Sequence, residues 1–196
     1  MGGGAWQVKA LPSYLDNLSN ARKNRYVKLH PDEFLSEEAT GKKYDYTIYI
    51  DGKIRITCDI KPLVYSLIES GKTIATHMNP RNDIYAEAGM AFVHKDLPYK
   101  DVKAQMDFYK SKGMPECFGV TENAVIIRKC NDPEVNSLME QWWEQIQRFT
   151  HRDQLSLPYV LWKNGVDISY IFSLGYNIWG SPFFIFHIHK KKHSKN

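Results

Sequence analysis

The segment Tyr44-Asp45-Tyr46-Thr47-Ile48-Tyr49-Ile50-Asp51-Gly52-Lys53-Ile54-Arg55-Ile56 joins an apolar run to an abrupt polar stop. Its β-branched and aromatic residues from Thr47 to Ile50 predict a buried strand, and Asp51-Gly52 supplies the turn chemistry that ends it. Ligands of open α/β sheets bind outside the carboxyl ends of strands, so the Asp51 carboxylate is well placed to hold a metal ion or a sugar. A simple Asp-Gly hairpin is the alternative interpretation.

The composition is that of an ordinary globular protein. The 196 residues suffice for one domain with a single core, and 43% of them are hydrophobic and 24% charged. The net charge is only +4 and the two signs are interspersed, which argues against a dedicated nucleic-acid-binding protein. The 12 Tyr and 5 Trp are compatible with sugar or base stacking, although cores and interfaces use the same side chains.

Cysteine usage and the terminal sequences indicate the cellular compartment to expect. The 3 cysteines have no C-x-x-C spacing, which favours a reducing compartment over a disulfide scaffold or a zinc site. No apolar segment approaches the roughly 20 residues that span a bilayer, and the N-terminus does not resemble a signal peptide. We therefore expect a cytoplasmic protein with one domain at residues 1–189. The basic tail at 190–196 is expected to be disordered, with peripheral contact to an anionic membrane surface as the alternative.

Periodicity and capping signals predict the remaining elements. Strands are expected at 6–9, 54–57, 73–77, 122–128 and 183–189, and helices at 60–70, 84–94, 98–109, 133–149 and 153–163. Asp132 and Pro133 mark the start of the longest helix, in which Leu138, Trp142 and Ile146 form an apolar stripe. Such a stripe is typical of a core-facing helix.

Charged residues gather at two places in the first half of the chain. A cationic cluster at 20–25, continued by Lys28, is suited to diphosphate oxygens, and a solvated charge run is the alternative. The strand predicted at 73–77 leads into four candidate residues within eleven positions, namely His77, Arg81, Asp83 and Glu87. Cations there would hold phosphate, and acids would bind sugar hydroxyls or transfer protons. The structural alternative makes Asp83 an N-cap and Glu87 an exposed helical residue.

The segment Thr150–Ser156 is the densest polar group between two predicted helices. Arg152 and Gln154 are placed to contact a substrate, and Asp153 is suited to capping the following helix.

Near the C-terminus, His187 and His189 share one face of the last predicted strand, because side chains alternate along a strand. Two imidazoles on one face can ligate a metal ion. A pair of surface histidines is the alternative.

Four motifs in this order resemble one family. They are Tyr49-Ile50-Asp51-Gly52-Lys53, His77-x3-Arg81-x-Asp83-x3-Glu87, Ala124-Val125-Ile126-Ile127-Arg128 and Arg148-Phe149-Thr150-His151-Arg152-Asp153-Gln154-Leu155-Ser156. The chain is similar to the glycosyltransferase-like domain family that includes plant mucilage-related and turgor-regulation-defect proteins and many bacterial homologues. The similarity covers roughly Arg22 to Lys163. Two positions depart from the family motifs: Tyr49 stands where the family has Trp, and Leu157 where it has Phe.

The resemblance implies an α/β, GT-A-like (Rossmann-like) fold with a mixed central sheet flanked by helices. It also implies transfer of a sugar, expected to be a hexose, from a nucleotide-sugar donor to a glycan or other hydroxyl acceptor. Asp51 would belong to the metal and donor site. Asp153 would lie on the acceptor side as a base or transition-state stabiliser.

Together the residues and the resemblance give one set of site assignments. The expected catalytic residues are Asp153 and Glu87. The expected substrate-binding residues are His77, Arg81, Asp83, Arg152, Gln154 and Lys53. The expected ligands of a divalent cation, Mn²⁺ or Mg²⁺, are Asp51, His187 and His189.

Two departures from the family leave other functions open. Family members carry a further first βα segment before the region that begins here near Trp6, and Asp51 stands alone where many enzymes of this fold have an Asp-x-Asp pair. The alternatives are a shortened, non-catalytic relative that binds a glycan or a partner, and a metal-dependent hydrolase on the same scaffold.

Overall fold

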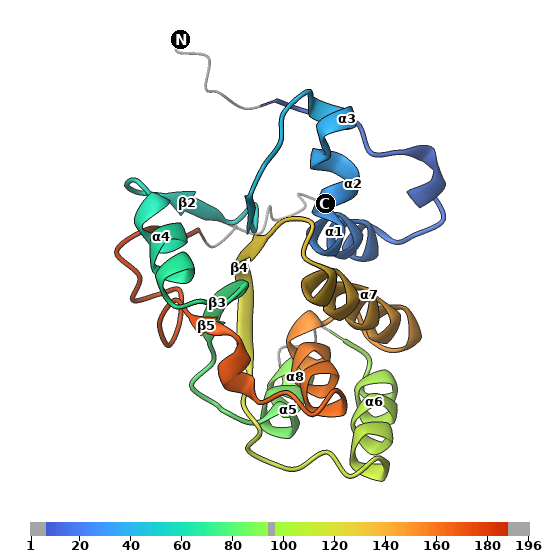
Figure 1. Cartoon of the computed structure of the whole chain (residues 1–196). Coiled ribbons are helices and arrows are strands. Elements are labelled where there is room, and N and C mark those ends of the chain that lie inside the picture. The colour runs from blue at the N-terminus through green and yellow to red at the C-terminus, as the bar shows by residue number, and fades with distance from the viewer. Residues whose placement is uncertain (1–6, 94–96, 188–196) are drawn as a thin grey trace, which may run out of the picture.

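A four-stranded mixed sheet forms the centre of the computed structural model, which describes residues 7–93 and 97–187 (Figure 1). Its strands are β1 (Tyr46–Ile50), β3 (Ile74–Met78), β4 (Thr121–Lys129) and β5 (Phe172–Ser173), in the order β1-β4-β3-β5. β4 is antiparallel to both β1 and β3, and β5 is parallel to β3. β1 and β3 therefore run in the same direction, and their carboxyl ends meet at one edge of the sheet.

Helices cover both faces of this sheet. They are α1 (Asn20–Leu29), α2 (Pro31–Leu35), α3 (Glu37–Thr40), α4 (Lys61–Glu69), α5 (Ile84–Val93), α6 (Tyr99–Ser111), α7 (Pro133–Arg148) and α8 (Asp153–Lys163), with short 3₁₀ turns at Ser13–Leu15 and Ile168–Tyr170. In Figure 1, α1, α5, α6, α7 and α8 lie on one side of the sheet, and α4 lies on the other with β2 (Ile54–Ile56). The expected fold class, a mixed α/β sheet flanked by helices, is confirmed.

The Asp51-Gly52 turn joins two different sheets. β1 pairs with β4, whereas β2 pairs with β6 (Phe184–Phe186) in a separate two-stranded sheet. The backbone N–H of Asp51 donates to the carbonyl of Ala124 at 2.8 Å, so the β1–β4 pairing continues to the turn. The hairpin interpretation is therefore wrong, because the two strands that flank the turn do not pair with each other.

β4 bulges at the edge where β1 and β3 end. Thr76 pairs with Ile126, but the next residue of β3, His77, pairs with Glu122. Residues 123–125 therefore have no counterpart on β3, and the pairing resumes at His77–Glu122 and Met78–Thr121. Bulges of this kind often occur beside functional sites, where they change the direction of side chains.

The helical layer packs through α7 and α8 as their patterns predicted. Leu138, Trp142 and Ile146 are buried in one core cluster with residues of α8. Leu157, which replaces the Phe of the family motif, is 0% exposed in the same cluster. The departure at Leu157 thus lies in the core.

The N-terminal elements differ from expectation. Residues 7–10 form no strand, and α1 occupies residues for which no helix was predicted. None of the helices within the described ranges is long and apolar enough to cross a membrane. His189 and the tail 190–196 lie outside the described residues.

Candidate functional site

A polar cavity of about 310 Å³ opens where β1 and β3 end. The charged side chains that line it are Arg25, Lys28, Asp51, Arg81, Glu87, Glu122, Arg152 and Asp153. Asn79, Asn123, Ala124, Gln154, Ile178, Trp179 and Phe186 complete the lining. The cavity lies at the small end of the range for ligand sites, and segments distant in sequence build it.

Glu87 is the first of two buried acids in the wall of this cavity. It lies in the first turn of α5 and is 0% exposed, although the sequence left open an exposed position. Its carboxylate accepts hydrogen bonds from Nη1 of Arg81 at 2.7 Å and Nη2 of Arg152 at 2.5 Å. Nδ2 of Asn79 donates at 3.1 Å. Glu87 therefore holds two guanidinium groups, one from the loop after β3 and one from the start of α8.

Asp153 is the second buried acid, and it is 5% exposed at the first position of α8. Its Oδ2 forms ion pairs with Lys28 Nζ and, at 3.2 Å, with Arg25 Nε. Burial would raise the pKa of the Asp153 carboxyl, but Lys28 and Arg25 together bring it below its ordinary value. Burial lowers the pKa of Lys28 to about 8, against the attraction of Asp153. Both cations belong to α1 and to the cationic cluster at 20–25, continued by Lys28, that was expected to bind anions.

Each buried acid thus faces two cations, which leaves one positive charge in excess around Glu87 and one around Asp153, while Asp51 and Glu122 bring the charges that line the whole cavity to four of each sign. Guanidinium and ammonium groups are the side chains that bind phosphate oxygens, with Arg offering paired N–H donors. The arrangement suits a diphosphate or another anion with several oxygens.

Asp51 and Glu122 are the other acids of the cavity, and neither is in an ion pair among the residues that the structure describes. Asp51 follows β1 and accepts a weak hydrogen bond from the backbone N–H of Lys53 at 3.4 Å. Glu122 lies in β4, and its Oε2 accepts from the backbone N–H of Ile178 at 2.9 Å. Burial, together with the negative charge of Glu87, raises the pKa of the Glu122 carboxyl.

The TOD1/MUCI70 glycosyltransferase-like domain is the family whose pattern matches this chain, over residues 40–175. The match covers more than half of the sequence. The chain belongs to this family. The matched region contains both buried acids with Arg81 and Arg152, whereas Arg25 and Lys28 precede it.

The probable hexosyltransferase MUCI70 of Arabidopsis thaliana is a curated relative of this TOD1/MUCI70 domain. The two are 28% identical over 126 residues, which cover 59% of this chain and 21% of the plant protein. The chain thus corresponds to about a fifth of that relative's length. A comparison with solved structures finds no match.

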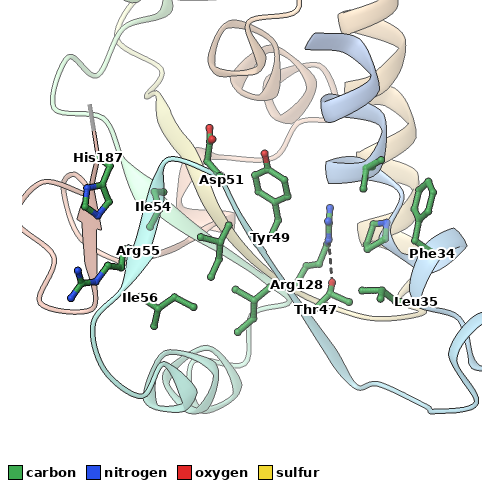
Figure 2. Close-up of a pocket in the computed structure, with 15 residues that line it drawn as sticks. Phe34, Leu35, Thr47, Tyr49, Asp51, Ile54, Arg55, Ile56, Arg128 and His187 are labelled. Carbon is green, nitrogen blue, oxygen red and sulfur yellow. Dashed lines mark hydrogen bonds between the residues drawn. The ribbon is translucent and has the colours of Figure 1, made fainter. Parts of the chain in front are cut away.

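Asp51 of the TOD1/MUCI70 domain also lines a second, larger cavity of about 930 Å³. Figure 2 shows this cavity between the β1–β2 segment and α2, with Tyr49, Ile54 and Ile56 among its mostly apolar lining. Asp51 is the one residue common to the described linings of both cavities. Its carboxylate therefore stands at the boundary between a polar and an apolar space.

The predicted metal ligands do not form a complete site within the described residues. Asp51 and His187 both line the larger cavity, Asp51 after β1 and His187 after β6 (Figure 2). No group of three or more His, Cys, Asp or Glu side chains able to hold a metal occurs in residues 7–93 and 97–187. Glu87 and Asp153 are already occupied by cations. His189 lies outside the described residues, so the metal assignment stays a prediction.

Of the predicted substrate-binding residues, Arg81, Arg152 and Gln154 line the polar cavity. His77 does not. Its ring is 1% exposed and lies 6.0 Å from that of Phe184, and neither ring nitrogen has a hydrogen-bond partner among the described residues.

Asp83 and Lys53 also lie away from the polar cavity. The Asp83 carboxylate accepts from the backbone N–H groups of Tyr85 and Ala86 at the start of α5, and from that of Cys117. These N–H groups hold the pKa of Asp83 below its ordinary value against the opposing effect of burial. This is the N-cap role that the sequence offered as the alternative. Lys53 is exposed in the turn after Asp51 and is absent from both linings.

Sequence reasoning missed several residues of the cavity, among them Asn79, Glu122, Asn123 and Trp179. Glu122 and Asn123 stand at the polar start of a strand that is otherwise apolar, and that contrast was the available signal. Asn79 and Trp179 lie in loops, where no periodic pattern marks a buried or ligand-facing side chain.

Proposed function

We propose that this TOD1/MUCI70 domain transfers a hexosyl group from a nucleotide-sugar donor to a hydroxyl group of a glycan or another acceptor. One observation supports the proposal most: a cavity at the carboxyl ends of β1 and β3 in which two buried acids each hold two cations. The family to which the domain belongs, and the relative named as a probable hexosyltransferase, point to the same chemistry.

The four cations would bind the donor diphosphate. Negative charge grows on the diphosphate as its bond to the sugar breaks, and oriented N–H donors in a partly enclosed site stabilise that charge. Arg81 and Arg152 are fixed in place by Glu87, and Arg25 and Lys28 by Asp153. The two acids expected to be catalytic, Asp153 and Glu87, then serve as positioning residues, because each is bound to two cations.

A divalent cation, Mn²⁺ or Mg²⁺, stays part of the proposal only as a prediction. Such an ion would neutralise the same leaving diphosphate. Asp51 is the residue from which a ligand is predicted, and it lines the polar cavity without an ion pair among the described residues. The other ligands would have to come from His187, His189 or the substrate.

The direct test incubates the protein with a panel of sugar nucleotides, namely UDP-glucose, UDP-galactose and GDP-mannose, and measures release of the nucleoside diphosphate and thermal stabilisation. Each reaction runs with Mn²⁺, with Mg²⁺ and with a chelator, which tests the metal prediction separately. At least one donor is expected to raise the melting temperature and to be consumed. If every donor fails both to raise the melting temperature and to be consumed, that result would count against the proposed function.

A matched pair of variants tests where the diphosphate binds. Arg81→Gln removes a charge-assisted contact worth about 1.5–3 kcal/mol, so the KM for the donor should rise about tenfold to a hundredfold. Lys100→Gln removes an exposed cation at the start of α6 and should leave that KM unchanged. Equal KM values in the two variants would place the diphosphate elsewhere.

Two other outcomes correspond to the alternative functions. A donor that stabilises the protein without being consumed would indicate a non-catalytic relative. Consumption of the donor with release of free sugar, and no transfer to any acceptor, would indicate a hydrolase.

A further inference from the structure

Trp179 is an exposed aromatic side chain at the rim of the polar cavity. It lines the cavity and is 62% exposed, which is unusual for a side chain with so large an apolar surface. Its ring lies against that of Phe186, with centroids 4.5 Å apart and an interplanar angle of 44°. A pyranose has an apolar face of C–H bonds as well as hydroxyl groups, so an aromatic ring beside polar groups suits it.

Glu122 lies on the same side of the cavity as Trp179, and its carboxylate has different partners from those of the two buried acids. Glu87 and Asp153 are each held by two cations, whereas no cation is paired with Glu122 in the part of the chain that the structure describes. A single backbone N–H, that of the buried Ile178, fixes one oxygen of its carboxylate. A carboxylate free of ion pairs in a partly buried site is the kind of group that accepts a proton.

One short segment positions both residues. Ile178 anchors Glu122 through its N–H and is followed directly by Trp179, and both Ile178 and Trp179 line the cavity. The cations of Glu87 and Asp153 belong to the helical side, on α1, on α8 and in the loop before α5. The cavity therefore has a cationic wall and a separate wall with a free acid and an exposed aromatic ring.

We propose that Glu122 and Trp179 form the acceptor subsite: Trp179 stacks against the acceptor sugar, and Glu122 takes the proton of the attacking hydroxyl. The inference rests on the proposed function, because it assigns the second substrate of the same reaction.

The acceptor oxygen forms a bond to C1 of the donor sugar while its proton passes to the Glu122 carboxylate. The bond between C1 and the diphosphate oxygen breaks, and its electron pair leaves with the nucleoside diphosphate, whose charge the cationic wall stabilises. Glu122 later releases the proton to solvent.

Glu122→Gln tests the proton transfer. The amide keeps an oxygen for the Ile178 N–H, so the fold and the donor site are retained, but it cannot accept the proton. Transfer should fall at least a hundredfold, in line with the contribution of a general base, while thermal stabilisation by the donor stays within about twofold in apparent affinity. Transfer at more than a third of the wild-type rate would overturn the role of Glu122.

Trp179→Ala and Trp179→Phe test the stacking, and this test does not require turnover. Methyl β-glucoside, methyl β-galactoside and methyl α-mannoside serve as probes, with binding followed by tryptophan fluorescence for the wild type and by calorimetry for the variants. At least one probe should bind the wild-type protein, about equally to the Phe variant and at least fivefold more weakly to the Ala variant. Equal binding to all three proteins, or no binding to any, would overturn the subsite.

Failure of the proposed function and failure of the acceptor-subsite inference give different results. If no sugar nucleotide binds or reacts but the methyl hexosides bind in a Trp179-dependent way, the proposed function fails and the sugar subsite stands. If transfer occurs and both Glu122→Gln and Trp179→Ala behave as wild type, the proposed function stands and this inference fails.

Discussion

Glu87 and Glu122 are the same residue type at one cavity with opposite surroundings. Glu87 is 0% exposed and bound to two guanidinium groups, whereas Glu122 is half-buried and bound to one backbone N–H. A carboxylate that is held by two cations gains little from accepting a proton, while one that is desolvated and forms no ion pair gains more, even with Arg81 near enough to oppose that gain. In the proposed mechanism, the partners of each acid decide that Glu87 positions cations and that Glu122 accepts a proton.

His77 makes a prediction about stability and pH. Burial lowers the pKa of its imidazole from 6.5 to about 4. Between these two values the unfolded chain binds more protons than the folded chain, so the free energy of unfolding falls as the pH is lowered. From pH 7 to pH 5 the wild type should lose about 2 kcal/mol through this residue. His77→Phe keeps a ring and removes the titration, so urea unfolding should show a loss smaller by that amount. Parallel losses in the two proteins would contradict this explanation.

At the scale of elements, the N-cap of α7 is expected to contribute measurably to the free energy of unfolding. The Asp132 carboxylate accepts from the backbone N–H groups of Glu134 at 3.1 Å and Val135 at 3.3 Å. Asp132→Ala should lower the free energy of unfolding by about 1 kcal/mol, because it leaves these two donors without a partner. Asp132→Asn keeps the cap and loses the ion pair with Lys129, so it separates capping from charge. Equal losses in the two variants, measured by urea unfolding, would assign the effect to charge.

The elements that local chemistry specifies were predictable, and those that depend on distant contacts were not. Asp132-Pro133 predicted the start of α7, where Asp132 caps the adjacent turn. The capping role expected of Asp153 is wrong, because Arg152 is the N-cap residue of α8 and the Asp153 carboxylate pairs with Lys28 and Arg25 instead. α1 was missed because its sequence is mostly polar and only 2 of its residues, Lys28 and Leu29, are buried. Lys28 is buried through its contact with Asp153, 125 positions away, which no pattern within α1 can show.

The candidate site, too, was predictable only in part. The motifs identified Asp51, Arg81, Glu87 and the Arg152–Gln154 segment, all of which line the polar cavity. The sequence could not show that Glu87 and Asp153 are paired with cations, because pairing depends on how α1, α5 and α8 pack. It also could not show the bulge of β4 beside Glu122, since residues 122–128 have the pattern of a continuous strand.

At the scale of the whole molecule, the Lys28–Asp153 pair joins the first helix to the last. Lys28 Nζ contacts both the Asp153 carboxylate and, at 2.5 Å, the carbonyl of Asn123 in β4, so α1, α8 and the sheet meet at one ammonium group. Arg128 of β4 adds a second link, because its guanidinium donates to the carbonyl of Lys28. The cavity and the packing of the helical layer on the sheet therefore depend on the same contacts.

A double-mutant cycle tests that dependence. Asp153→Asn leaves a buried ammonium group without its counter-charge and should cost about 3–5 kcal/mol in the free energy of unfolding. Lys28→Met should cost less, because Arg25 remains 3.2 Å from Asp153. The double variant should be more stable than the sum of the single losses indicates, with a coupling energy of about 1–3 kcal/mol. The same cycle on Lys103 and Asp107, an exposed pair on α6, is the control and should show no measurable coupling. Equal coupling in the two cycles, measured by urea unfolding at pH 7, would mean that the buried pair does not link α1 to α8.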